Sequence, residues 1–410
     1  MFTQITLARW RQFEHVSLEL DSRMTVLTGE NGTGKTTILN ILSRHFGWNL
    51  QLISTPIPLS KKRAKRFWSD VWSMMESDSN VNPESIEIGR IRYDNGPECT
   101  LMAPPQVEQA QYNLTYQNQS RALGIHIPSH GPNFTYQRIE NIPTDPKSSE
   151  QQYQQYQTLL QQLYSGGKAQ NPGATLKQSL ISLAVFGYGN QAVVPNPEYE
   201  RMFRRFQEIL AILLPQKIGF RQLEIRMPDI VFKTDSGDFS LDAASGGIGA
   251  IVGLAWQIFM YGADQNSYVV TLDEPETHLH PSMQRELLPN LFKAFPNVQF
   301  IVATHSPFVA TSLSDAKVYA LVYNDANRIT SQLLDTADLA GSANETLREI
   351  LGVPMSFPIW VEHRLEQIVN KYRNQPMTIE RLRDLKAELS SGGLERLLPL
   401  AIDRLGDNNA

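Results

Sequence analysis

The sequence predicts an α/β fold with a mixed sheet whose core is split between two separated parts of the chain. Three β-rich runs indicate the sheet: Met24–Thr28, Val269–Asp273 and Phe300–Thr304. Each run is mostly apolar and β-branched and is followed by glycine or polar side chains, as in buried strands whose carboxyl ends carry a ligand site. The residues at 37–43 have apolar side chains at helical spacing, which predicts a helix soon after the first strand.

A glycine-rich segment joins that first strand to its helix. Gly29–Thr36 reads G-E-N-G-T-G-K-T and fits the phosphate-binding loop G-x-x-x-x-G-K-[ST] without a mismatch. The glycines let successive N–H groups point at phosphates, and the helix brings its positive end to the same place. A glycine turn beside a surface lysine is the alternative, but the flanking strand and helix disfavour it. The expected nucleotide-binding residues are Gly29, Asn31, Gly32, Gly34, Lys35, Thr36 and Thr37.

Two strand ends downstream carry groups that suit a phosphate site. Asp273 and Glu274 end one β-rich run, and His305 follows the next. We expect Asp273 to hold Mg²⁺, Glu274 to polarise an attacking water and His305 to sense a γ-phosphate through a hydrogen bond. Alone, a strand that ends in Asp-Glu or in histidine is usually structural. The phosphate-binding loop upstream favours the functional interpretation.

The turn Ser245-Gly246-Gly247 opens a long apolar helix just before the second strand. Small residues at a helix start expose N–H groups to an anion, so this turn is a candidate γ-phosphate contact. A glycine-rich cap on a core helix is the alternative. The uncharged stretch Ser245–Ala263 approaches the length of a membrane span. Because it leads directly into a predicted site strand, we interpret it as a buried helix.

Together, these four segments resemble the ABC-type ATPases, in particular the branch of the overcoming-lysogenisation-defect (OLD) and RecF-like proteins. The phrases that carry the resemblance are Asp273-Glu-Pro-Glu-Thr-His-Leu-His280-Pro281 and Ala303-Thr-His-Ser-Pro307. The resemblance covers about residues 2–46 and 239–323. It implies a P-loop ABC-type ATPase head, with ATP and Mg²⁺ as cofactors.

The resemblance also implies roles for single residues. ATP is expected between protomers, with Lys35 of one and Ser245 of another, so the protein is expected to be at least a dimer. Thr36 and Asp273 match the magnesium ligands, Glu274 matches the catalytic base, and His305 matches the switch histidine.

Two elements of the family pattern are not matched directly in this sequence. Ile248 stands where the signature turn usually continues with a polar residue. Gln137 is the candidate for the glutamine that, in this family, links the nucleotide to the helical lobe, and we count it among the expected metal-site residues.

Composition limits the classes of protein. The chain has 410 residues, a hydrophobic content of 41% and a charged content of 19%, which is ordinary for a globular protein. The net charge of −5 disfavours attraction of nucleic acid over the whole surface. The single Cys99 excludes an intrachain disulfide framework and fits a reducing compartment. No secretory signal is recognised, so we expect a cytoplasmic protein that does not enter the membrane.

Four regions are expected: 1–46, the first core lobe; 47–218, a compact insertion; 219–340, the remaining core; and 341–410, a helical tail. Within the insertion we expect a helix at 61–75, a hairpin around Asn95-Gly96 and amphipathic helices at 150–162 and 199–214. The basic runs Lys61–Arg66 and Arg201–Arg205 fit either contacts to nucleic-acid phosphates or, more commonly, solvated helix faces.

The tail does not match the Toprim nuclease domain that OLD-type nucleases carry. Glu362 lies in a helical pattern, and no Asp-x-Asp pair follows it. The resemblance then implies an ATPase that controls a separate nuclease or toxin effector, as in the two-gene antiphage systems Septu and PARIS and in some retrons. Two alternatives stay open: a RecF-like DNA-repair ATPase that clamps DNA, and an ATP-gated scaffold with negligible turnover.

Overall fold

The computed structural model describes residues 1–56, 67–72, 85–107, 109–129, 136–143, 147–164, 166–167, 171–335, 339, 358–373 and 378–406. The chain forms two compact units, Met1–Thr346 and Leu347–Ala410. The basic run Lys61–Arg66 lies outside the described residues.

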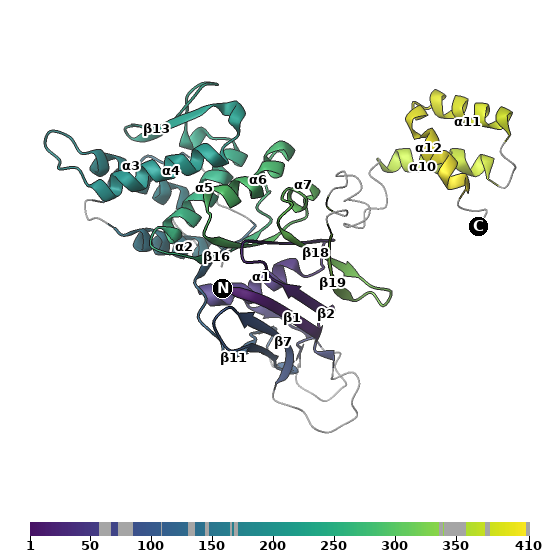
Figure 1. The fold of residues 1–410 in the computed structure, drawn as a ribbon, viewed down its shortest axis with the longest axis horizontal. Helices are drawn as coiled ribbons and strands as arrows, with labels where there is room; N and C mark the ends of the chain where they lie inside the picture. Colours follow the sequence, from purple (N-terminus) through teal and green to yellow (C-terminus); the bar gives the residue numbers. More distant parts are fainter. Residues whose placement is uncertain are drawn as a thin grey trace. The chain divides into compact units, whose positions relative to one another are not determined.

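The larger unit is built on one sheet of eleven strands, in the order β11-β8-β7-β1-β2-β19-β18-β3-β17-β16-β12. Five neighbours, β18, β3, β17, β16 and β12, run parallel to one another, whereas β1, β2, β7, β8 and β11 form antiparallel pairs (Figure 1). The predicted α/β fold with a mixed sheet is therefore confirmed. The strands are β1 (Phe2–Trp10), β2 (Phe13–Glu19), β3 (Met24–Gly29), β7 (Ile86–Tyr93), β8 (Cys99–Ala103), β11 (Thr115–Gln117), β12 (Gly124–Ile127), β16 (Tyr268–Asp273), β17 (Val298–Ala303), β18 (Lys317–Tyr323) and β19 (Ile329–Leu333).

The central strands are apolar because both of their faces are covered. Every residue of β3, β16 and β17 is buried, which explains why these runs do not alternate between polar and apolar side chains. Helix α1 (Lys35–Ser43) packs against these three strands. The three predicted core strands and the helix after the first strand are confirmed.

The segment 47–218 contributes to this sheet rather than forming a separate insertion throughout. The predicted hairpin is present as β7 and β8, but β7 also pairs with β1 and thereby extends the sheet. Strand β12 lies at the opposite edge, beside β16. The alternating buried residues of β7 and β8, such as Ile91 and Leu101, join the same core as Phe2, so burial of this face drives the hairpin onto the sheet.

Part of the helix expected at 61–75 is a strand. Phe67 and Trp68 form β6, which pairs with β5 (Thr55–Pro56) and β9 (Gln106–Val107), while the rest of that expected helix is largely outside the described residues. Strands β4 (Leu52–Ile53) and β10 (Gln111–Tyr112) form a further small pair. The Trp10 indole N–H donates to the carbonyl oxygen of Ser69, 2.9 Å away, which holds this region against β1.

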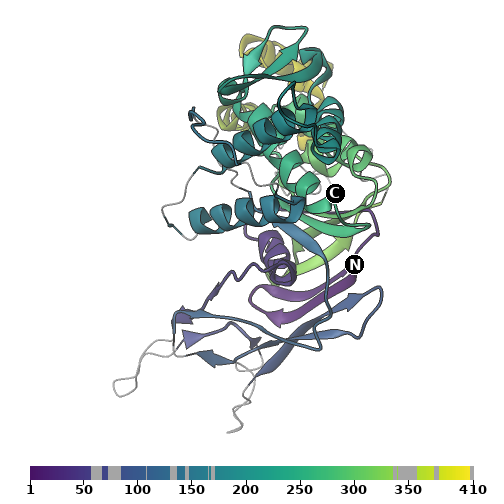
Figure 2. The same cartoon turned by 90° about the vertical axis from the view of Figure 1, so that its left-hand side faces the viewer.

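A helical layer packs beyond the β16 end of the sheet (Figures 1 and 2). Both amphipathic helices expected there are present, and the apolar stripe of the first, Tyr153, Tyr156 and Leu160, is buried. The helices are α2 (Ser149–Tyr164), α3 (Pro172–Tyr188), α4 (Pro197–Leu213), α5 (Gly246–Gly262), α6 (Pro281–Ala294) and α7 (Pro307–Ala310). A three-stranded sheet, β13 (Phe220–Arg226), β14 (Asp229–Thr234) and β15 (Phe239–Ser240), and the 3₁₀ turn η4 (Leu241–Ala243) lead into α5.

Helix α5 is buried along most of its length, as expected for the uncharged stretch. Across the described part of the chain, no helix combines the length and apolar character needed to cross a membrane.

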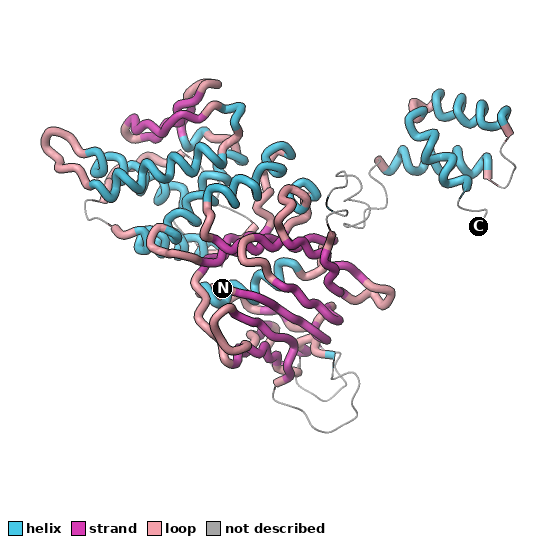
Figure 3. Tube along the Cα trace, viewed as in Figure 1, coloured by secondary structure: helices cyan, strands magenta, loops and turns pink. Residues whose placement is uncertain are grey.

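The smaller unit is helical in its described part (Figure 3). It contains α10 (Ile359–Tyr372), α11 (Ile379–Ser391) and α12 (Leu398–Gly406), around a core that includes Leu365, Leu385 and Ala401. Glu362 lies in the first turn of α10, in agreement with the helical pattern expected for it.

Candidate nucleotide site

The sheet topology brings three chemically distinct loops to one edge. Strands β3, β17 and β16 are parallel neighbours, with Ala303 level with both Leu27 and Asp273. The phosphate-binding loop follows β3, Glu274 follows β16, and His305 lies two residues beyond β17. Because parallel strands present their carboxyl ends at one edge, segments far apart in sequence form one site.

The loop after β3 needs glycine for steric reasons. Gly29 and Gly34 have φ values of 136° and 89°, where a side chain is strained. A Cβ at Gly29 would lie 2.4 Å from the carbonyl oxygen of Leu321, and a Cβ at Gly34 would lie 2.3 Å from the ring of Phe13. The loop is thus curled tightly against β18 and β2, ahead of the N-terminus of α1, in the form that an anion-binding loop requires.

Lys35 is a buried cation within this loop. Its ammonium donates to the carbonyl oxygens of Gly29 and Glu30, each 2.8 Å away. Burial lowers the pKa of Lys35 to about 8, although Glu274 and Asp273 act in the opposite direction. Lys35 is therefore charged at neutral pH and is held beside the loop where phosphates are expected.

Thr36 and Asp273 provide a pair of oxygen ligands suited to magnesium. The Thr36 hydroxyl donates to Asp273 Oδ1 over 3.1 Å. Asp273 is only 5% exposed, and burial raises its pKa to about 6. Among the described residues, no cluster of three or more His, Cys, Asp or Glu side chains forms a metal site. A hydroxyl, one carboxylate and phosphate oxygens fit Mg²⁺, which usually uses few protein ligands.

Glu274 and His305, the two residues predicted to be catalytic, lie side by side. Glu274 Oε1 lies 3.3 Å from His305 Nε2, and both side chains are about one-third exposed. Burial, followed by the nearby charge of Lys35, lowers the pKa of His305, so its imidazole is neutral at neutral pH. Glu274 has a φ of 46°, while its N–H donates to the carbonyl oxygen of Ala303 over 2.8 Å. This strained backbone at a strand end fixes the direction of the carboxylate.

Glu276 belongs to the site, although sequence reasoning assigned it no role. Its Oε1 accepts hydrogen bonds from the Thr304 hydroxyl, the His305 N–H and the Ser306 N–H, at 2.5, 3.1 and 3.2 Å. Burial raises its pKa. Glu276 thus anchors the loop that carries His305. The signal was its place in Asp-Glu-Pro-Glu, two residues after Glu274.

Ser245 lies at the start of α5, as expected. Its side chain makes no capping hydrogen bond, and Ser245 and Gly246 are exposed. Both line a cavity of about 200 Å³ together with Asp273 and Glu274 of the same chain. Gly247 is buried, and a Cβ there would lie 3.0 Å from the His278 carbonyl oxygen. The turn therefore needs small residues and is accessible from outside the protomer. Ile248, which follows it, is half-buried.

The metal-site role of Gln137 stays a prediction. Its main-chain carbonyl oxygen accepts a hydrogen bond from Lys177. The strand end next to Asp273 is that of β12, because Ile127 is level with Leu272. Pro128 and Ser129 follow that strand and line the cavity with Asp273. The residues directly after β12 thus lie beside Asp273, and Gln137 lies further along the chain.

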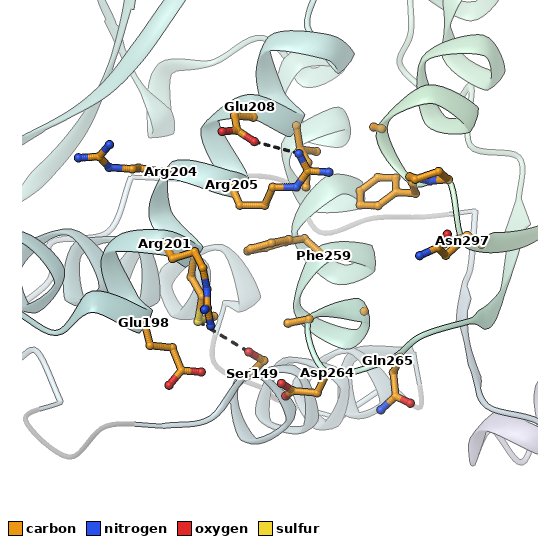
Figure 4. A pocket seen from close by; sticks show the side chains of 18 of the residues that line it. Ser149, Glu198, Arg201, Arg204, Arg205, Glu208, Phe259, Asp264, Gln265 and Asn297 are labelled. Atoms are coloured by element: carbon orange, nitrogen blue, oxygen red, sulfur yellow. Dashed lines mark hydrogen bonds and ion pairs between the residues drawn. The ribbon is translucent and has the colours of Figure 1, made fainter.

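The basic run on α4 is largely neutralised. Arg204 pairs with Glu200 at 2.5 Å, and Arg205 pairs with Glu208 at 2.9 Å. These side chains line an open groove of about 700 Å³ in which acidic groups, including Asp264, alternate with the arginines (Figure 4). Such mixed charge is typical of a solvated helix face, not of a phosphate-binding strip.

Comparison with protein families decides the assignment. Residues 104–311, half of the chain, match the family model described as "AAA domain, putative AbiEii toxin, Type IV TA system". The chain belongs to this family. A second AAA-domain model matches residues 4–183. The chain is thus a P-loop ATPase, which implies that it binds ATP.

Curated proteins similar to this ATPase include a probable retron ATPase and two Septu proteins. A 53-residue segment is 45% identical to the retron Ec83 probable ATPase of Escherichia coli, and covers 13% of this chain and 10% of that protein. A 90-residue segment is 34% identical to the Septu protein PtuA of Bacillus mycoides, and covers 21% of this chain and 13% of that protein. These matches span only about a tenth of the length of each relative. The PtuA protein of Bacillus thuringiensis aligns over 93% of this chain and 87% of its own length, at 19% identity.

Among solved structures, an Smc head bound to the C-terminal winged-helix domain of ScpA matches 82% of this chain and 98% of its own, at 17% identity and a TM-score of 0.46. The Smc head domain of Thermotoga maritima matches 82% of this chain and 99% of its own, at 16% identity and a TM-score of 0.39.

Proposed function

We propose that this ATPase hydrolyses Mg²⁺-ATP slowly at subunit interfaces and thereby controls a separate nuclease or toxin effector in bacterial antiphage defence. The observation that carries the ATPase part is the meeting of Lys35, Asp273, Glu274 and His305 at the carboxyl ends of three neighbouring strands. The link to defence is supported by the similarity to retron and Septu proteins.

The residues divide the work of phosphoryl transfer. The loop N–H groups and Lys35 bind the phosphates, while Thr36 and Asp273 hold Mg²⁺, which neutralises charge on the phosphates when bound. Glu274 accepts a proton from, or orients, the attacking water. Neutral His305 Nε2, 3.3 Å from Glu274, keeps that carboxylate aligned. Only positioning and electrostatics are required, because phosphoryl transfer needs little covalent chemistry from the protein.

The exposed Ser245 turn supports a shared site. Its small residues and free helix start suit the γ-phosphate of a nucleotide bound to a second protomer. ATP would then join two protomers, and dissociation would follow hydrolysis. The assembly state of an oligomer of at least two subunits would thus depend on the bound nucleotide, and the effector would respond to that state.

Direct clamping of DNA is less well supported. The chain has two basic runs that could contact DNA. Lys61–Arg66 lies outside the described residues, and in Arg201–Arg205 the side chains of Arg204 and Arg205 are paired with glutamates. A labelled DNA duplex titrated at low and high salt separates the two functions, since clamping predicts tight, salt-sensitive binding.

The first test is the native mass of Glu274→Gln protein, measured by light scattering with and without Mg²⁺-ATP. Glutamine preserves the shape of the side chain but cannot serve as a base, so ATP should persist and the assembly should grow. Lys35→Ala is the control that should bind no ATP and show no growth. Wild-type turnover by Glu274→Gln would refute the assignment. Effector control is then tested by whether Glu274→Gln alters the activity of a co-expressed nuclease or toxin.

A further inference from the structure

A buried lysine in the helical layer has no part in the chemistry described above. Lys177, on α3, has a side chain that is only 1% exposed. Its ammonium donates to Asp229 Oδ1 and Asp242 Oδ2, both at 2.5 Å, and to the carbonyl oxygen of Gln137 at 3.0 Å. A lysine ammonium has three N–H donors, and these three acceptors use all of them.

This triad of Lys177, Asp229 and Asp242 ties together elements that lead to the signature turn. Asp229 is the first residue of β14, and Asp242 lies in the 3₁₀ turn η4. Asp242 is three residues before Ser245. The N–H of Ala244 donates to the carbonyl oxygen of Leu241 over 3.2 Å, so little free backbone separates the triad from the start of α5.

Ser245 itself has no side-chain anchor. Its hydroxyl makes no capping hydrogen bond, and the residue is exposed. Its position therefore depends on the segments on either side, α5 after it and η4 before it. Within η4, Leu241 is 1% exposed and the Asp242 side chain is 7% exposed, so both are held inside the protein.

We propose that Lys177, acting through Asp242, is a positioning residue that holds the Ser245 turn in the geometry required for ATP hydrolysis. The two carboxylates are not equivalent. Asp229 is 28% exposed and water can solvate it, whereas Asp242 is almost fully buried and relies on Lys177. Disturbing Asp242 acts on the residues directly before Ser245, whereas Asp229 lies on β14, further from the turn along the chain.

A purely stabilising role predicts a different behaviour. Apolar residues of similar size can often replace a buried ion pair without loss of stability. A paired replacement, Lys177→Met with Asp242→Leu, is therefore expected to keep the fold but lose the fixed position of the turn. The double variant should then lose ATP turnover while its melting temperature stays close to that of the wild type. A purely stabilising role predicts that turnover falls only if stability falls as well.

The test compares Asp242→Asn with its matched control, Asp229→Asn, in the full-length protein. For each we would measure the melting temperature, the Kd for Mg²⁺-ATP, kcat, and the dependence of turnover on protein concentration. Asp242→Asn should lower kcat at least about tenfold, because a displacement of about 1 Å can cost up to about a hundredfold in rate. Its Kd at low protein concentration should stay within about twofold, because the phosphate-binding loop is intact.

Asp229→Asn should stay within about threefold of wild-type kcat even if its melting temperature falls. In a Ser245→Ala background, Asp242→Asn should cause no further loss, since both act through the same turn. Equal kcat losses in the two Asn variants, or additive losses with Ser245→Ala, would overturn the inference.

The inference rests on the proposed function, and different experimental results would refute each of them. If wild-type protein and Glu274→Gln show the same turnover, the assignment of the catalytic site is wrong. If Glu274→Gln is inactive but Asp242→Asn turns over ATP like the wild type, only the role of Lys177 is wrong.

Discussion

Replacing Asp273 by asparagine should stabilise the protein while abolishing its activity. Burial raises the pKa of Asp273 from 3.8 to about 6. Each pKa unit corresponds to about 1.4 kcal/mol, so ionised Asp273 costs the folded state about 3 kcal/mol at neutral pH. Asparagine Oδ1 still accepts from the Thr36 hydroxyl, but the buried negative charge is gone. Allowing for burial of the amide, we expect a gain of about 1–3 kcal/mol.

The stability gain of Asp273→Asn should depend on pH in a way that identifies the ionisation of Asp273 as its cause. A carboxyl group whose pKa is raised on folding is ionised more easily in the unfolded chain, so the penalty develops as the pH rises from 3.8 to about 6. The advantage of Asp273→Asn should therefore be complete above pH 6 and should vanish near pH 4. Thermal unfolding at both pH values, without Mg²⁺ or nucleotide, measures it; each kcal/mol raises Tm by roughly 2–4 °C or less in a domain of this size.

The matched control is Glu274→Gln. This side chain is 36% exposed, so its neutralisation should change stability by less than about 0.5 kcal/mol at either pH. A destabilised Asp273→Asn protein, or a gain that is the same at pH 4 and pH 7, would refute the idea that ionised Asp273 is held at a cost until a metal binds.

The remaining predictions concern turnover. Glu276→Gln should lower kcat about tenfold with little change in KM, because the loop of His305 loses a charged acceptor; steady-state kinetics check this, and an unchanged kcat contradicts it. The value of kcat/KM should rise with pH as Asp273 ionises near pH 6 and fall as Lys35 loses its proton near pH 8. A profile that is flat from pH 5 to pH 9 would show that neither group limits the free enzyme. Gly34→Ala should abolish nucleotide binding, measured by titration with fluorescent ATP, because its methyl group would meet an aromatic ring at 2.3 Å; wild-type affinity would contradict the steric argument.

The sequence predicts the nucleotide edge well because its parts are local. The phosphate-binding loop needs only its own glycines and the strand and helix beside it, and fully apolar runs identify β3, β16 and β17 as central strands. Parallel pairing of those strands then brings Asp273 and His305 to the same edge of the sheet as the loop.

Features that depend on distant partners are not predicted. The β7–β8 hairpin has a clear turn, but only its long-range pairing with β1 shows that it extends the sheet. The phrase Asp-Glu-Pro-Glu draws attention to Glu276, but the contacts of its carboxylate become visible only when β17 brings Thr304 and the His305 N–H to it. The neighbours of Asp273 likewise depend on the pairing of β12 with β16, which the sequence does not predict.

The place of β19 in the sheet affects how this protein can be synthesised. Strand β2 pairs with β19, and the N–H of Ser17 donates to the Ser331 hydroxyl over 2.9 Å, across 314 positions of sequence. Strand β3 likewise lies between β17 and β18, both from the last third of the larger unit. A nascent chain that has emerged only to residue 290 therefore has its phosphate-binding loop and Phe13 of β2, but it lacks β17 and β18, the strands on both sides of β3. Such a high contact order makes folding slow and leaves β3, and the edge of β2 that faces β19, unpaired on the ribosome. ATP binding is thus acquired late, after nearly the whole larger unit has been translated.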